Sequence, residues 1–272
     1  MILPPGIVMN TIIGASLAAV VCSMIGVFIV RMNLSSMGFC MSHAAFAGAA
    51  LGLAISRDPF ALALGMATAV ALILGPVADK ARLQADVVLG TMFSLTMALA
   101  LLFLSIAPGS VVSSTALSVL WGSVLGITTT DLIRLLVLML TLLVVIFLFY
   151  KEFFAIMLDR KLAEESGINT KPFYYAILFL CGVTVSVSLK LIGGLLIFAL
   201  MVNPVSSAYQ FSHDMRWIML ISPIIGLASS ISGIAASLYL DIPVGSSIAI
   251  MSVAVFLVSV ALSPKRKRGQ KC

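Results

Sequence analysis

Two residues that could bind a metal ion lie in an apolar stretch near the N-terminus. His43 is one of only two histidines, and Cys40 precedes it by three residues within the segment 38–48. Residues three apart share one face of a helix, so a thiolate and an imidazole could approach the same ion. This pair of ligands suits a borderline or soft metal such as zinc. A packed histidine held by a hydrogen bond beside a small buried cysteine is an equal alternative.

Three further polar residues border or interrupt apolar runs and could line a path through a membrane. Asn203 precedes Pro204, and a proline within a helix frees backbone carbonyl groups that could face such a path. Asp86 and Asp241 each lie at the edge of an apolar run. Carboxylates also stabilise helix ends, and a proline can simply bend a helix, so structural roles are the alternative for all three residues.

The longest polar segment, 151–171, reads KEFFAIMLDRKLAEESGINTK. Its centre favours a helix that ends at Gly167, because glycine is common just beyond the last helical turn. A charged helix between two apolar runs indicates a docking element for a soluble partner. A plain solvated loop is the alternative.

The usual catalytic and nucleotide-binding motifs are absent from the sequence. It contains no GxxxxGK[ST] phosphate loop, no HExxH and no GxSxG, and no two carboxylates share an apolar helix. The sequence therefore predicts no catalytic residues. An intramembrane enzyme, which would need polar residues converging from adjacent helices, is the weaker hypothesis.

The composition indicates that a membrane-embedded fold positions these residues. The 272 residues are 61% hydrophobic and 10% charged, with a mean hydropathy of +1.20, whereas a soluble domain carries about 25% charged residues. The apolar runs are long and apolar on every face, which favours helices over the alternating strands of a barrel. The sequence predicts an all-α, polytopic transmembrane helical bundle with about eight or nine spans in one domain, 1–272.

A span needs roughly 20 apolar residues. By that measure the predicted helices are 7–30, 38–56, 60–78, 87–107, 131–150, 172–189, 191–210, 217–239 and 244–262. A further short interfacial or re-entrant helix is predicted at 116–127, with Trp121 at the level of the lipid headgroups.

The charges predict how the chain is oriented. Sixteen Lys and Arg against ten Asp and Glu give a net charge of +6. With nine spans and the N-terminus outside, most of the basic residues fall on the cytoplasmic side, as the positive-inside rule requires. The basic tail, 263–272, is then a cytoplasmic anchor beside anionic lipid, and nucleic acid is not an expected partner. The four cysteines have no CxxC spacing, so no disulfide framework is predicted.

Several segments, in order along the chain, resemble the permeases of ABC importers for metal ions. The residues that carry the resemblance are Gly26 to Met32, Ser42-His43-Ala44 with Gly48, Asp86 to Gly90 with Phe93-Ser94, Asp159 with Ala163, Gly167 and Ile168, Lys190 to Leu196 with Pro204 and Ala208, and Asp241 to Gly245. Together they cover nearly the whole chain.

The resemblance implies a transport subunit in the cell membrane of a prokaryote. It implies a homodimer of this chain, two cytoplasmic ABC ATPase subunits that hydrolyse ATP and dock on 151–171, and an extracytoplasmic metal-binding protein. The cargo would be a divalent metal ion of the zinc, manganese or iron class, with no stably bound cofactor. The candidate site residues are His43 and Cys40 for metal, Ser42, Asp86, Asn203 and Asp241 for the path, and Asp159, Ala163, Glu164 and Gly167 for ATPase docking. Of these, Cys40, Asn203 and Glu164 are candidates from their own chemistry and position, and the resemblance implies the others.

One residue departs from the family pattern. Where the family usually has an acidic residue, four positions before the motif histidine, this chain has Phe39. Phe39 removes a hard oxygen ligand, and Cys40 could supply a soft one in its place. A different metal or a metal chelate is therefore an alternative cargo. A carrier or channel that works without an ATPase is the more distant alternative.

Overall fold

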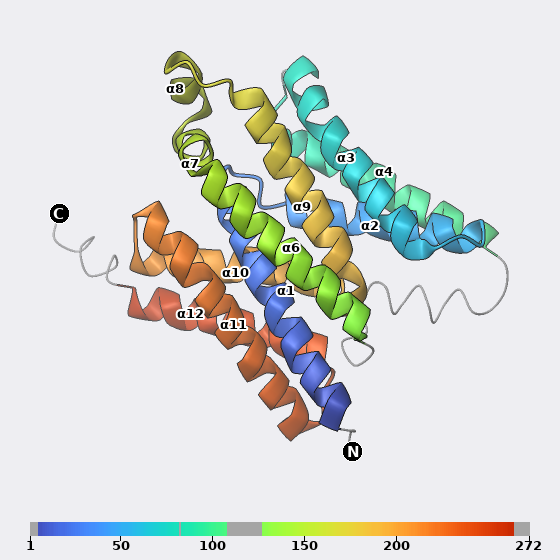
Figure 1. Ribbon diagram of the computed structural model, residues 1–272. Coiled ribbons are helices and arrows are strands. Elements are labelled where there is room, and N and C mark those ends of the chain that lie inside the picture. The colour runs from blue at the N-terminus through green and yellow to red at the C-terminus, as the bar shows by residue number, and fades with distance from the viewer. Residues whose placement is uncertain (1–4, 82, 108–126, 264–272) are drawn as a thin grey trace.

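The computed structural model describes residues 5–81, 83–107 and 127–263, and every regular element within these ranges is a helix (Figure 1). Most of the predicted short helix at 116–127 lies outside the described residues, as do Trp121, residues 264–272 of the basic tail and Cys272. The expected all-α fold is confirmed for the described part of the chain.

Nine of the described helices are long and apolar enough to cross a membrane. They are α1 (Pro5–Arg31), α2 (Met37–Ala54), α3 (Pro59–Ala81), α4 (Ala85–Ile106), α6 (Thr129–Leu148), α9 (Thr170–Ile192), α10 (Gly194–Phe211), α11 (Met215–Leu240) and α12 (Val244–Leu262). Each corresponds to one of the nine predicted spans. Two shorter helices, α7 (Tyr150–Leu158) and α8 (Arg160–Glu165), occupy most of the polar insert, 151–171.

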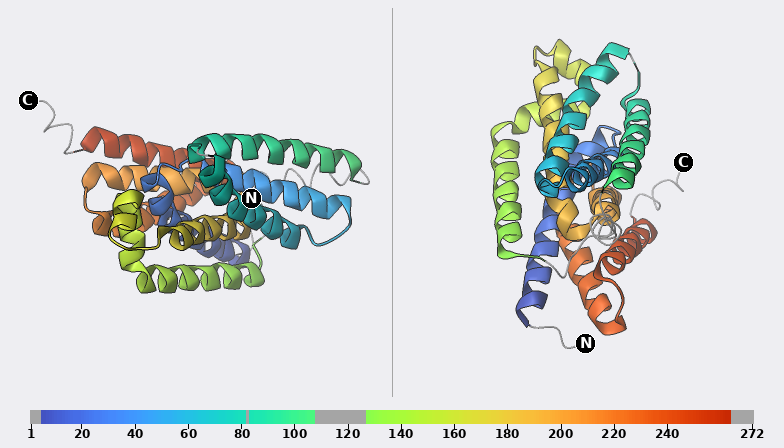
Figure 2. Two further views of the ribbon diagram at one scale, coloured as in Figure 1. Left: turned by 90° about the horizontal axis from the view of Figure 1, so that it is seen from above. Right: turned by 90° about the vertical axis from the view of Figure 1, so that its right-hand side faces the viewer.

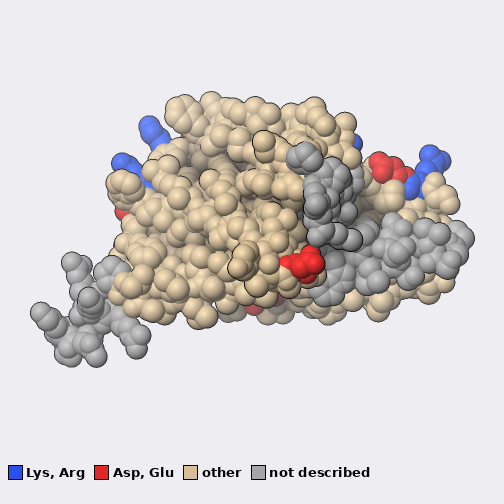
Figure 3. Space-filling view, turned by 90° about the horizontal axis from the view of Figure 1, so that it is seen from below, with Lys and Arg blue, Asp and Glu red and all other residues tan. Residues whose placement is uncertain are grey.

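The helices form two groups around a central core. Figures 1 and 2 show α2, α3 and α4 on one side and α11 and α12 on the other, with α1 and α9 between them. In α1 and α2, 72% of the residues in the most apolar stretch are buried, against 22% in α4 and α12. The outer helices therefore present apolar side chains outward, as helices surrounded by lipid do. On the face shown in Figure 3, the blue Lys and Arg side chains lie at the edges, and most of the described surface between them carries neither sign of charge.

Glycines allow the core helices to approach one another closely. A Cβ atom at Gly26 of α1 would lie 2.1 Å from the carbonyl oxygen of Met201 in α10, and one at Gly48 of α2 would lie 2.2 Å from that of Leu62 in α3. Small residues at such crossings let helix backbones pack directly in lipid. The same reasoning explains why the apolar runs of α1 and α2 can be buried on nearly every face.

A single residue, Gly193, separates α9 from α10. Its backbone φ of 79° and ψ of 157° lie in a region that other residues rarely adopt. The chain can therefore turn sharply between two spans without a loop.

One end of the bundle carries the polar insert and will be called the insert end. α1, α3, α6, α10 and α12 finish there. Contacts between segments far apart in the sequence hold this end together. The guanidinium Nε of Arg31, at the end of α1, donates to the carbonyl of Met157 in α7 at 3.1 Å. Ser263, after α12, donates to the carbonyl of Gln210 in α10 at 3.2 Å.

Candidate functional site

His43 lies in a cluster of aromatic rings contributed by three helices. Its ring centroid is 4.6 Å from that of Phe39, one turn earlier on α2, and 4.8 Å from that of Phe93 on α4. Phe39 also stacks on Phe93 at 5.0 Å and meets Phe198 of α10 edge-on at 5.9 Å. We call Phe39, His43, Phe93 and Phe198 the aromatic cluster.

Among the described residues, one imidazole nitrogen of His43 has no hydrogen-bond partner. This atom, Nδ1, is buried, while the ring as a whole is half-buried. A neutral imidazole with a free nitrogen can bind a metal ion. No three His, Cys, Asp or Glu side chains come together within residues 5–81, 83–107 and 127–263. In one copy of the chain, His43 is thus a single ligand among aromatic rings.

Cys40 and Ser42 lie on α2 beside His43 but face the interior. Cys40 is 1% exposed and belongs to the main hydrophobic core. The Ser42 hydroxyl donates to the carbonyl of Phe39 at 2.8 Å, and its side chain packs against Gly194 at the start of α10. Neither residue has an exposed polar group available to a passing ion in this conformation.

Asn203 and Pro204 lie in the middle of α10, where they take part in helix packing. The amide nitrogen Nδ2 of Asn203 donates to Ser252 Oγ of α12 at 2.9 Å. Pro204 has no amide hydrogen to donate to the carbonyl of Leu200, but Ser23 of α1 donates to that oxygen at 3.1 Å. The freed carbonyl predicted from the sequence is therefore engaged by a neighbouring helix.

The two candidate carboxylates are exposed at opposite ends of the bundle. Asp86, in the first turn of α4, accepts a hydrogen bond from Ser36 Oγ at 2.5 Å at the insert end. Asp241 ends α11 in a left-handed conformation, with φ 55° and ψ 40°. Each therefore has a helix-end role in the structure.

The candidate docking residues build a short, well-defined helix. The Asp159 carboxylate accepts from the backbone nitrogens of Lys161 at 2.7 Å and Leu162 at 3.3 Å, and so caps the start of α8. Gly167 has a φ of 85° and lies just beyond the end of the helix. There the Ile168 nitrogen donates to the carbonyl of the buried Ala163 at 3.1 Å, a common way to close a helix.

Sequence reasoning missed three features near α8. Leu158 and Leu162 are 54% and 62% exposed although they lie within the polar insert. Asp79, at the end of α3, pairs with Arg160. Glu164, a candidate docking residue, accepts a hydrogen bond from the Thr170 hydroxyl at the start of α9. Leu158 and Leu162 stand out as apolar residues in the sequence of 151–171. The Asp79–Arg160 pair joins residues 81 positions apart, so no local sequence pattern indicates it.

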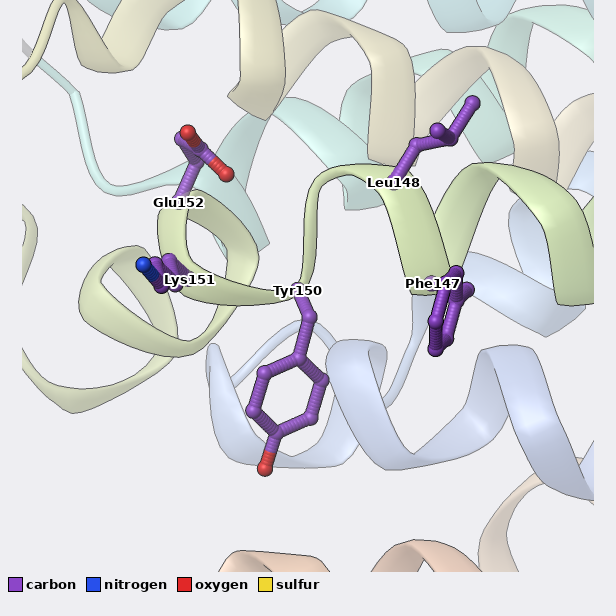
Figure 4. Close-up of a pocket in the computed structure, with 5 residues that line it drawn as sticks. All are labelled: Phe147, Leu148, Tyr150, Lys151 and Glu152. Atoms are coloured by element: carbon purple, nitrogen blue, oxygen red, sulfur yellow. The ribbon is translucent and has the colours of Figure 1, made fainter.

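A cavity opens where α6 gives way to α7. It has a volume of about 660 Å³ and is lined by Phe147, Leu148, Tyr150, Lys151 and Glu152. Figure 4 shows Phe147 and Tyr150 pointing to one side of this corner and Leu148 to the other. Phe147 is 84% exposed, so the corner joins an apolar surface to the charged start of the insert.

Similar proteins include membrane subunits of manganese transport systems. The manganese import system permease protein ScaB of Streptococcus gordonii is 26% identical over 258 residues, which cover 95% of this chain and 92% of ScaB. The manganese transport system membrane protein MntC of Listeria monocytogenes is 28% identical over 248 residues, covering 91% of this chain and 87% of MntC.

The fold and the whole length of the chain agree with this similarity. A chain of the PsaBC structure from Streptococcus pneumoniae in complex with Fab superposes with a TM-score of 0.83 at 24% identity, covering 95% of this chain and 92% of that one. The model of the ABC 3 transport family matches residues 6–263. This chain therefore belongs to the ABC 3 transport family.

Proposed function

We propose that this chain is the membrane-spanning permease subunit of an ATP-driven importer for a divalent metal ion, with manganese as the first candidate. The family match and the manganese permeases ScaB and MntC support this class of cargo. The chain would supply the path, and partner subunits would hydrolyse ATP.

The observation that carries the proposal is the exposed face of α8 and its neighbour α7. Leu158 and Leu162 are exposed beside four exposed charged residues, Asp159, Lys161, Glu164 and Glu165. Exposed apolar groups rimmed by polar ones are typical of protein interaction sites. The cap at Asp159 and the turn at Gly167 fix the helix, so it can present these leucines as a rigid unit to an ATPase subunit.

The distribution of basic residues supports a cytoplasmic insert end. The described Lys and Arg at that end are Arg31, Lys80, Lys151, Arg160, Lys161, Lys171 and Arg216, whereas Arg57, Arg134 and Lys190 lie toward the other. Cytoplasmic loops carry such an excess. The N-terminus would then be extracytoplasmic and the C-terminus cytoplasmic.

The transporter would contain two copies of this chain, two ATPase subunits and an extracytoplasmic metal-binding protein. ATP binding would draw the ATPase subunits together, and the helices would rock between outward-open and inward-open states. His43 would act as a transient ligand on the path, because a permeation site must release the ion that it accepts. The path would run at or near the interface between the two copies.

The aromatic cluster supports a second candidate cargo within the same function. Phe39 replaces the expected hard oxygen ligand with an apolar ring, which stacks on Phe93. A site with one imidazole and three phenylalanines suits a softer ion, such as zinc, or a metal chelate better than it suits manganese. Competitive uptake of manganese, zinc, iron and cobalt by cells that express the complete system separates these cargoes. His43→Ala and Cys40→Ser, run beside it, test whether either residue contacts the cargo.

The docking role is tested at Gly167. Gly167→Arg places a bulky side chain at a φ of 85° and should abolish both metal uptake and co-purification of the ATPase subunits, with normal membrane insertion. Gly167→Asn is the matched control, because asparagine tolerates this conformation, and it should retain most of the uptake. Unchanged uptake by correctly inserted Gly167→Arg would refute docking at α8.

A further inference from the structure

Arg160, the first residue of α8, is joined to the end of a membrane-spanning helix. Its guanidinium nitrogens Nη1 and Nη2 lie 3.4 and 3.3 Å from the two carboxylate oxygens of Asp79 in the last turn of α3. Two parallel contacts of this kind fix orientation as well as distance, since the guanidinium fork matches a carboxylate. A lysine could not make this pair of contacts.

The same guanidinium also contacts the start of α9. Its Cζ lies 4.6 Å from the centre of the Tyr174 ring, and the neighbouring Tyr175 hydroxyl donates to Asp79 Oδ2 at 3.0 Å. Arg160 Nε is 3.3 Å from Thr170 Oγ1 and 3.6 Å from Glu164 Oε1. Arg160 and Asp79 thus join α8, α3 and α9 at one point.

The α3 helix connects this point to the aromatic cluster. A Cβ at Gly75 would lie 2.3 Å from Cε1 of Tyr175, so α3 packs tightly on α9 one turn before Asp79. Near the other end of α3, a Cβ added at Gly48 of α2 would lie 2.2 Å from the carbonyl oxygen of Leu62, so α2 and α3 are also in direct backbone contact. α2 carries His43. Closely packed helices move together rather than bending around each other.

We propose that the Asp79–Arg160 pair is the mechanical joint that passes movement of α8 to α3, and through α3 to α2 and the aromatic cluster. This inference rests on the proposed docking of an ATPase subunit on α8. Both residues are positioning residues that touch neither ATP nor the metal ion. The side chains of Asp79 and Arg160 are 35% and 29% exposed, and ion pairs that solvent can reach contribute little to stability. Loss of the pair should therefore uncouple the transporter rather than unfold it.

The test uses the complete transporter in liposomes, with Mn²⁺ uptake and ATP hydrolysis measured together. Asp79→Asn and Arg160→Gln should each lower the number of Mn²⁺ ions moved per ATP hydrolysed by about five- to tenfold, with the ATPase subunits still bound. The double exchange Asp79→Arg with Arg160→Asp re-forms the ion pair and should recover a large part of this ratio, which a purely steric role would not allow.

Arg134→Gln is the matched control. Arg134 also pairs with a carboxylate, that of Asp131 at 3.4 Å, and lies 4.5 Å from the centre of the Phe60 ring, but near the start of α6, away from the insert end. Its loss should leave the ratio of Mn²⁺ to ATP unchanged.

The outcomes separate this proposal from the docking function on which it rests. If Asp79→Asn leaves the number of Mn²⁺ ions moved per ATP unchanged while the ATPase subunits stay bound, the proposed role of the Asp79–Arg160 pair is refuted and docking at α8 is not. Normal binding of the ATPase subunits by Gly167→Arg would instead refute docking at α8, and with it the proposed role of the Asp79–Arg160 pair. If a single variant fails to insert into the membrane, the double variant Asp79→Arg with Arg160→Asp is the deciding test. Recovery of the number of Mn²⁺ ions moved per ATP supports the proposed role of the pair, and a number that stays low contradicts it.

Discussion

The hydroxyl of Ser23 donates a hydrogen bond to the carbonyl of Leu200, 3.1 Å away on another helix. Pro204, four residues after Leu200, cannot provide the amide hydrogen that would ordinarily reach this oxygen. Ser23 is fully buried, and Ser222 of α11 in turn donates to its carbonyl at 3.4 Å. A proline in α10 thus creates an acceptor that ties α10 to α1.

Ser23→Ala is expected to destabilise the protein by about 1–2 kcal/mol, because a buried carbonyl loses its donor. The measurement is the thermal unfolding midpoint of the detergent-solubilised protein. Ser16→Ala on the same helix is the control, since the Ser16 hydroxyl is buried without a partner among the described residues. In a Pro204→Ala background, where the helix can supply the donor itself, Ser23→Ala should cost distinctly less. An equal loss in both backgrounds would refute this explanation.

Gly26→Ala should weaken the contact between α1 and α10. The new Cβ would lie 2.1 Å from the backbone oxygen of Met201, which cannot move aside as a flexible side chain could. We expect a loss of about 1–3 kcal/mol, measured as the shift of the unfolding midpoint. In Gly65→Ala of α3, the new Cβ would meet no atom of the described residues within 4 Å, so this variant should be neutral or slightly stabilising. Equal unfolding midpoints for the two variants would contradict this close contact between α1 and α10.

Asp241→Val should destabilise the turn between α11 and α12. A β-branched residue at a φ of 55° is strained, with an expected cost of about 1–2 kcal/mol. Asp241→Asn removes the charge but tolerates the conformation, so its unfolding midpoint should match that of the unmodified chain. A midpoint for Asp241→Asn as low as that of Asp241→Val would show that the charge, not the backbone, holds the turn.

Phe39→Glu should shift cargo preference toward manganese. The carboxylate would lie one helical turn from His43 and add the hard ligand that manganese favours over zinc. We expect the ratio of manganese to zinc uptake to rise about fivefold, equivalent to about 1 kcal/mol. Phe39→Leu removes the ring without adding a ligand and should leave the ratio unchanged. If both variants raise the ratio equally, the oxygen ligand is not the cause.

The membrane spans could be predicted from the sequence because each is a long apolar run, and the bilayer sets its length. The sequence predicts the break between the sixth and seventh spans at residue 190, but α9 continues to Ile192. Gly193-Gly194 continues an apolar stretch, and the positive φ of Gly193 ends α9 there. The sequence does not predict α7 as a separate helix, because only Phe149 separates it from α6 and no glycine or proline marks the bend.

Only those parts of the candidate site whose residues lie close together in the sequence could be predicted. The segment around His43, and the Asp159 cap and Gly167 turn of α8, each span only a few residues, so the sequence pattern indicates them. The contacts of His43 with Phe93 and of Arg160 with Asp79 join residues 50 and 81 positions apart. Such pairs depend on helix packing, which the periodicity of a single helix does not determine.

We propose that this chain cannot transport metal ions by itself. The direct measurement is Mn²⁺ entry into liposomes that contain the chain alone, compared with liposomes that also contain the ATPase subunits, the binding protein and ATP. Entry should occur only with the complete set and should stop when a non-hydrolysable ATP analogue replaces ATP. Sustained Mn²⁺ entry through the chain alone would contradict this proposal and identify a carrier or channel instead.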